Sequence, residues 1–169
     1  AYDNVTAVAA TNQNDQRCSP ADWGPGYGSE YGDWVDIAAP GNLIYSTMPS
    51  YDVVMNNPPY TYTQNYSFGA GTSFSSPIVA GVAALLLTAD PSLPPDEVKA
   101  LICDNTDPYN STEYIGTGRI NAFKALLALD QRPNSPTITG PLKGTIGVAT
   151  AYYFTTTDPE NDTVFYFID

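Results

Sequence analysis

Short apolar segments separated by long polar stretches make up the first part of the chain. Three of these segments have the length and the Val, Ala and Ile content of β-strands, and they lie at 3–10, 34–39 and 42–47. The polar stretch at 11–33 is rich in Asn, Asp, Gly, Pro and Ser, which is typical of a loop. A second polar stretch at 50–66 is rich in Asn and Tyr, and we expect it to form an exposed excursion.

The pattern then changes to helical periodicity. The run SPIVAGVAALLLTA, from Ser76 to Ala89, is apolar on almost every side, which predicts a buried helix. A second helix is predicted at 92–104, where apolar residues recur at the spacing of one helix face: Val98, Leu101 and Ile102. A third helix is predicted at 121–129, with Asn121 as its N-cap.

A polar segment with two prolines, DQRPNSPT, divides the chain after residue 130. We assign residues 1–130 to one domain, 131–137 to a linker and 138–169 to the start of another domain. Beyond the linker, residues 146–156 and 163–168 are rich in Val, Thr, Tyr and Phe, as in strands. They predict the beginning of an all-β sandwich, which needs about 100 residues to be complete. In composition and in the segment T-D-P-x-x-D at 157–162, the tail from about Pro136 resembles immunoglobulin-like modules.

The net charge argues against two kinds of binding partner, nucleic acids and anionic membranes. There are 18 acidic and 6 basic residues, which gives a net charge of −12. Because phosphate backbones and anionic lipids attract clusters of Lys and Arg, we expect no nucleic-acid partner and no binding to anionic membranes. The longest apolar run, Ile78–Leu87, has about half the length of a membrane span, so we expect no membrane span. An acidic surface suits an extracellular protein, although solubility alone accounts for it too.

The two cysteines and the first residues of the chain are relevant to whether the protein is secreted. Cys18 and Cys103 are compatible with one disulfide of a secreted protein or with two buried thiols, because sequence gives no distance between them. Residues 1–10 lack a basic leader and a cleavage pattern, and there is no initiator Met. We therefore expect the chain to be part of a longer precursor.

Ser73 has a sequence setting that suits a nucleophile. Two small residues, Gly71 and Thr72, precede it, and the apolar helix follows it. Pro77 is tolerated in the first turn of a helix and breaks a helix interior, so it predicts a helix start close to Ser73. The free N–H groups of a helix N-terminus favour a negative charge, as an oxyanion in acyl transfer requires. The alternative is a serine that only caps the helix.

The run GTSFSSPIVAG at 71–81 resembles the serine motif of the subtilisin-like proteases, G-T-S-x-[AS]-x-P-x-V-A-G, at every fixed position. Further segments resemble the same family in the same order, and they are VTAVAATNQNDQR at 5–17, DIAAPG at 36–41, IYSTMPS at 44–50 and GTGRINAFKAL at 116–126. The resemblance covers roughly residues 1–130. It implies an α/β fold with a parallel sheet and flanking helices, here partial, and a secreted endopeptidase that acts on proteins or peptides.

The resemblance also implies roles for individual residues. Ser73 corresponds to the nucleophile of an Asp–His–Ser triad, its backbone N–H to an oxyanion donor, and Thr72 to a residue that supports the oxyanion site. The chain contains no histidine, and the family's Asp, His and oxyanion Asn segments lie upstream of the residues that match. We therefore expect the upstream part of the same precursor to carry the Asp and His, and this chain by itself to be inactive.

Members of the family often bind structural calcium. Asp36, with Asp33 and the backbone at 1–5, resembles a weak cation site of the family, and the alternative is that both are solvated loop carboxylates. The turn at 158–162 spaces three acidic residues as oxygen ligands but lacks a full calcium-loop pattern. No cofactor is expected for catalysis.

Two other functions stay open. A pseudoprotease domain that now only binds would be a non-catalytic surface protein, and upstream Asp and His motifs would distinguish it from an enzyme. A different serine hydrolase, such as an esterase, would need a G-x-S-x-G elbow, which does not occur here. The intact motif around Ser73 favours the protease.

Overall fold

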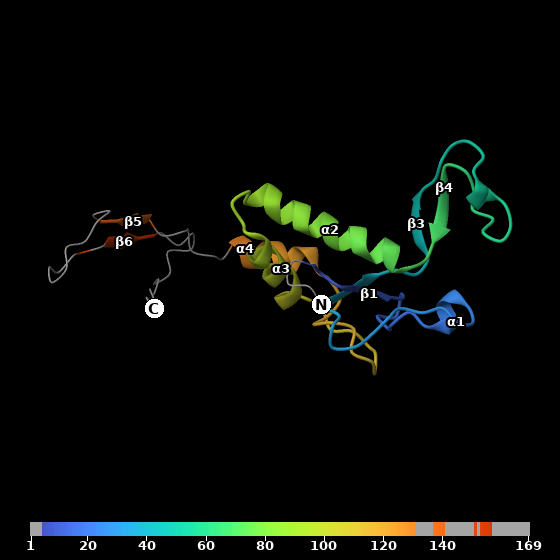
Figure 1. The fold of residues 1–169 in the computed structure, drawn as a ribbon, viewed down its shortest axis with the longest axis horizontal. Helices are drawn as coiled ribbons and strands as arrows, with labels where there is room; N and C mark the ends of the chain where they lie inside the picture. Colours follow the sequence, from blue (N-terminus) through green and yellow to red (C-terminus); the bar gives the residue numbers. More distant parts are fainter. Residues whose placement is uncertain (1–4, 131–136, 141–150, 152, 157–169) are drawn as a thin grey trace. The chain divides into compact units, whose positions relative to one another are not determined.

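The computed structural model describes residues 5–130, 137–140, 151 and 153–156 (Figure 1). The chain divides into two compact units, Ala1–Leu126 and Leu127–Asp169, and each is described by itself. The elements, in chain order, are β1 (Val8–Thr11), α1 (Pro20–Trp23), β2 (Ile37–Pro40), β3 (Ile44–Thr47), the 3-10 helix η1 (Val54–Asn56), β4 (Tyr66–Gly69), α2 (Thr72–Ala89), α3 (Pro95–Asp104), α4 (Ala122–Asp130), β5 (Thr137–Thr139) and β6 (Tyr153–Thr155).

A parallel pair of strands, β1 and β2, lies in the core of the first unit. Val8 stands opposite Ile37, and Thr11 stands opposite Pro40. The strands are almost fully buried, at Ala9, Ala10, Ile37, Ala38 and Ala39. Strands covered on both faces have continuous apolar sequences, as these two do. The pair confirms the predicted α/β architecture with a parallel sheet.

The segment that precedes α4 runs along the other edge of β2. The Ala38 N–H donates to the Gly118 carbonyl at 2.9 Å, and the Ile120 N–H donates to the Ala38 carbonyl at 2.8 Å. Gly116 has a φ of 95°, and a Cβ at this position would lie 2.5 Å from Asp36 C and Ile37 Cα. Only glycine combines this backbone conformation with such a close approach.

The helix α2 contacts β1, β2 and α3 (Figure 1). It begins at Thr72 rather than at Ser76, so Pro77 lies in its second turn and not in its first, which corrects our prediction. Proline has no N–H to donate to the carbonyl four residues earlier, so α2 lacks the bond from position 77 to Ser73. The helix start nevertheless lies close to Ser73, as predicted.

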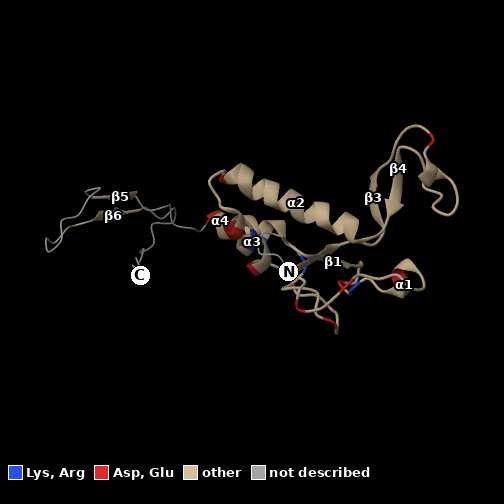
Figure 2. Cartoon of the chain, viewed as in Figure 1, with Lys and Arg blue, Asp and Glu red and all other residues tan. Residues whose placement is uncertain are grey.

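The prediction that this helix is buried on almost every side is wrong. Among the residues that the structure describes, the neighbours of α2 leave much of its surface exposed. Its buried residues are Ser75, Val79, Val82 and Leu86, whereas Leu85 is 50% exposed and Leu87 is 40% exposed. The reason is that β1, β2 and α3 cover a single face of the helix. The helix carries no charged side chain (Figure 2). It is long and apolar enough to cross a membrane, but core helices of soluble proteins and signal sequences meet the same criterion, so one such helix is weak evidence of a membrane span.

The other predicted elements agree with the structure except at their ends, while α1 and η1 lie in segments that were predicted as a loop and an excursion. The second predicted helix begins at Pro95, and Asn121 caps α4 as predicted, because the Lys124 N–H donates to its Oδ1 at 3.0 Å. Sequence reasoning missed β4, which pairs antiparallel with β3. Its sequence YSFG contains Ser and Gly, which weaken a strand pattern.

The second unit contains the antiparallel pair of β5 and β6, with Thr137 opposite Thr155. The predicted strand at 146–156 includes β6, and the predicted linker ends on the first residue of β5. The predicted strand at 163–168 lies outside the described residues. An immunoglobulin-like domain is not shown by this short pair, so that part of the predicted fold stays a prediction.

Replacing Gly116 with alanine should lower the free energy of unfolding by more than about 2 kcal/mol, because a side chain there meets a positive φ and the backbone of β2. Gly81→Ala is the matched control. Nothing lies within 4 Å of an added Cβ at this helical position, so alanine should stabilise by about 0.5–1 kcal/mol. Urea unfolding of both variants measures the difference, and equal effects would contradict the described packing.

Candidate active site

Ser73 lies in the first turn of α2 and is exposed. The N-cap of the helix is Gly71, with a φ of 139° and a ψ of 158°. A Cβ at Gly71 would lie 3.1 Å from Ser73 Oγ, so glycine leaves the hydroxyl open. The N–H groups in the first turn of a helix have no acceptor within the helix. The Ser73 N–H belongs to this first turn. Thr72, the first residue of α2, is half-buried beside it.

The start of α2 is attached to the carboxyl end of β2. Ser75 is fully buried, and its Oγ lies 3.0 Å from the Ala39 carbonyl and 3.1 Å from the Pro40 carbonyl. The Gly71 N–H donates to the Gly41 carbonyl at 2.8 Å. A Cβ at Gly41 would collide with Ser75 Oγ and lie 2.6 Å from Ala10 Cβ. The strand end and the helix start therefore meet without room for a side chain.

The same turn is fixed from the side of the β3–β4 hairpin. A Cβ at Gly69, the last residue of β4, would collide with the Phe74 ring. The Phe74 N–H donates to the Gly71 carbonyl at 3.0 Å. Residues on both sides of Ser73 are thus held by packing and hydrogen bonds, while Ser73 itself is exposed.

The structure brings Thr72 and Ser73 together and leaves Asp36 apart from them. Asp36 directly precedes β2, whereas α2 is attached at the other end of that strand. The Asp36 carboxylate accepts the Ala7 N–H at Oδ2, at 2.7 Å, and contacts Lys99 Nζ at Oδ1, at 2.9 Å. The Lys99 ammonium also donates to the Val5 carbonyl at 3.2 Å.

These contacts test whether a calcium ion fits beside Asp36. Calcium takes six to eight oxygen ligands at about 2.3–2.6 Å. An ammonium group already contacts the Asp36 carboxylate and a carbonyl of the predicted cation site, so the residues do not fit calcium while Lys99 is there. Elsewhere in the described residues, no three or more side chains of His, Cys, Asp or Glu gather as a metal site. The acidic turn at 158–162 lies outside the described residues.

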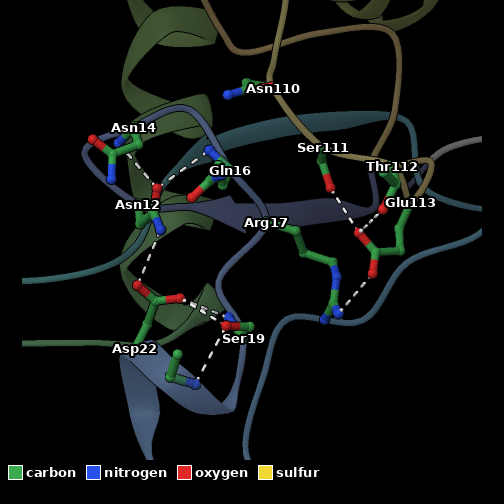
Figure 3. Close-up of a pocket in the computed structure, with 11 residues that line it drawn as sticks. Asn12, Asn14, Gln16, Arg17, Ser19, Asp22, Asn110, Ser111, Thr112 and Glu113 are labelled. Carbon is green, nitrogen blue, oxygen red and sulfur yellow. Dashed lines mark hydrogen bonds and ion pairs between the residues drawn. The ribbon is translucent and has the colours of Figure 1, made fainter.

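A polar pocket of about 580 Å³ lies between the loop that follows β1 and the residues around Asn110 (Figure 3). Ser73 is not among its lining residues. Arg17 forms an ion pair with Glu113 at 3.3 Å, and the Asp22 carboxylate accepts a hydrogen bond from the Asn12 amide at 3.0 Å. The Ser111 hydroxyl, with the Glu113 N–H and Arg17, lowers the pKa of Glu113 to about 2.

Both cysteines are free and buried, which decides between the two alternatives that the sequence left open. Burial, with a smaller contribution from the Asp22 carboxylate, raises the pKa of the Cys18 thiol to about 12. Burial and the Asp36 carboxylate raise the pKa of Cys103 to about 11. Neither thiol is activated as a nucleophile.

Sequence reasoning did not identify the residues that hold the site together. Ser75 and Gly41 lie within the matched segments, which was the available signal, but the contact between the helix start and the strand end joins residues 36 positions apart in the chain. Lys99 lies on a predicted helix, and nothing in its local pattern links it to Asp36.

Comparison with known proteins gives the class of this fold and site. The model of the subtilase family, Peptidase S8, matches residues 1–135. Thermitase from Thermoactinomyces vulgaris is 39% identical over 126 residues, which are 74% of this chain and 37% of thermitase. Subtilisin BL from Lederbergia lenta is 33% identical over 124 residues, which are 73% of this chain and 38% of that protein. A solved protease from Pseudoalteromonas arctica PAMC 21717 has a TM-score of 0.60 and 31% identity over 75% of this chain and 36% of its own.

The chain therefore belongs to the subtilase family. It spans less than two fifths of the length of the relatives named above.

Replacing Ser75 with alanine should lower the free energy of unfolding by about 1–3 kcal/mol, because the buried Ala39 carbonyl and the partly buried Pro40 carbonyl lose their hydroxyl partner. Ser76→Ala is the matched control, since Ser76 is the next residue and is exposed. Its effect should stay within about 0.5 kcal/mol. Denaturant unfolding of the two variants tests this, and similar losses would count against the contact with β2.

The raised pKa values of Cys18 and Cys103 predict protection from alkylation. At pH 8.5 both thiols should stay protonated in the folded protein and react with iodoacetamide at least about tenfold more slowly than in urea. Because folding raises both pKa values, this contribution to stability is complete below the unfolded pKa of 9.0 and is lost as the pH rises toward about 12. Intact-mass measurement reports the labelling, and a disulfide or fast native labelling would contradict the structure.

Proposed function

We propose that this chain supplies the nucleophile, Ser73, of a secreted serine endopeptidase whose substrates are proteins or peptides. The observation that carries the proposal is the exposed Ser73 hydroxyl in the N-terminal turn of α2, with glycine at the N-cap and buried contacts on both sides. The named relatives are proteases, which supports the same reaction.

The chemistry assigned to the site is acyl transfer. Ser73 Oγ attacks the scissile carbonyl and forms an acyl-enzyme, which water then hydrolyses. The Ser73 N–H donates to the oxyanion, and Thr72 supports the site from the adjacent position in the first turn. The positive end of the α2 dipole stabilises the same negative charge. An oxyanion donor contributes about 2.7–4 kcal/mol to such a reaction.

The general base comes from elsewhere, because the chain contains no histidine. We assign it, with the aspartate that orients it, to the upstream part of the same precursor. A groove of about 230 Å³ between β1, α2 and α3 supports this arrangement, and its apolar lining includes Val8, Val79 and Val98. The exposed Leu85 and Leu87 add to the apolar surface of α2. A largely apolar surface of this kind, with Lys99 as a charged residue in the groove lining, suits a covering segment of the same fold.

The proposal predicts hydrolysis by the longest polypeptide in which this chain occurs and none by residues 1–169 assayed separately. Loss of the serine or of the histidine of such a triad costs about 10⁶ in turnover. A chromogenic peptide substrate and a protein substrate such as casein both serve as the assay. Ser73→Ala should abolish the turnover, whereas Ser76→Ala, in the same helix, should retain it.

Two results would overturn the proposal. Turnover by residues 1–169 that disappears with Ser73→Ala would show that the base lies within the chain. An inactive but folded full polypeptide, with unchanged peptide affinity in Ser73→Ala, would instead support a domain that only binds.

A further inference from the structure

Lys99 extends from α3 to the start of β2, where it joins three segments of the chain. Its side chain lines the groove beside Val8 and Ile102, and its ammonium group reaches beyond the groove to Asp36. There it contacts Asp36 Oδ1 at 2.9 Å and the Val5 carbonyl at 3.2 Å. The other oxygen of Asp36 accepts the Ala7 N–H at 2.7 Å.

These partners are ones that a bound cation would use. A carboxylate and a backbone carbonyl are oxygen ligands typical of hard cations. The two charged side chains are only partly exposed, at 28% for Lys99 and 21% for Asp36, so the pair is shielded more than an ordinary surface pair. The site therefore favours one positive charge, and the ammonium provides it.

We propose that the Lys99 ammonium is the permanent cation of this site, so the protein binds no metal ion at Asp36. One ammonium neutralises one carboxylate, whereas a calcium ion in the same place would leave an excess positive charge on a single carboxylate. The ammonium has three donors, of which Asp36 and Val5 take two, so it satisfies the oxygens as a small cation would. The inference does not depend on the proposed protease activity.

Removal of the ammonium should convert the site into one that binds an external cation. In Lys99→Met the apolar stem is kept, and Asp36 and the Val5 carbonyl lose their positive partner. The melting temperature should fall by about 2–6 °C in choline chloride. Calcium chloride or sodium chloride at the same ionic strength should restore at least half of the loss, because a small cation takes the position of the ammonium. The unaltered protein should show no cation-specific shift that depends on Asp36.

The experiment is made by calorimetry on the longest polypeptide in which this chain occurs, with Ser73→Ala throughout to prevent autolysis. The double variant Lys99→Met, Asp36→Asn should show no restoration. Lys124→Met is the matched control, because Lys124 also contacts a carboxylate, Asp107 at 2.8 Å, and a carbonyl, Thr106 at 3.0 Å. Arg119 remains on Asp107 at 3.1 Å, so this variant should lose stability without cation-specific restoration.

Two results would overturn the proposal. One is a calcium-dependent rise in the melting temperature of the unaltered protein that is absent in Asp36→Asn. This result would mean that the ammonium leaves room for a metal ion at Asp36. Lys99→Met could instead lose stability equally in all salts, which would mean that Lys99 forms an ordinary ion pair and no cation site.

Discussion

The structure around Ser73 depends on one close contact, between the carboxyl end of β2 and the start of α2. The hydrogen bond from Gly71 to Gly41 and the buried hydroxyl of Ser75 both span it. Because a Cβ at Gly41 would collide with Ser75 Oγ, the contact exists only with glycine at that position. It places the first turn of the helix, with its free N–H groups, at the end of a buried strand. The exposed Ser73 therefore lies in a turn that hydrogen bonds and packing hold on both sides, an arrangement that suits the proposed nucleophile.

The other end of β2 is fixed by a different kind of interaction. There the carboxylate of Asp36 binds a backbone N–H of the segment before β1 and the ammonium of Lys99 from α3. Close packing at Gly41 and the Ser75 hydroxyl hold the carboxyl end of the strand, and an ion pair holds the other end. The two ends should therefore be sensitive to different substitutions. An added methyl group at Gly41 disrupts the carboxyl end, whereas loss of the Lys99 or Asp36 charge disrupts the amino end.

Much of this fold could be predicted from local patterns in the sequence. The helix at α3, the cap at Asn121 and the buried strands β1 and β2 follow from periodicity, capping chemistry and apolar runs. The position of Ser73 at a helix start followed from its motif. Local sequence patterns gave wrong or no predictions where contacts between distant parts of the chain determine the structure. Pro77 was placed in the wrong turn, because its missing N–H costs the helix a single bond that the packing of α2 offsets. The partner of Asp36 could not be predicted, since no local signal links it to Lys99.

Covalent labelling tests most directly whether Ser73 is the reactive serine of the protein. The longest polypeptide in which the chain occurs is treated with a fluorophosphonate, digested, and its labelled peptide is sequenced by mass spectrometry. We expect one adduct, on Ser73, that disappears in Ser73→Ala and persists in Ser76→Ala. An adduct on another serine, or a folded protein that gives no adduct, would contradict it.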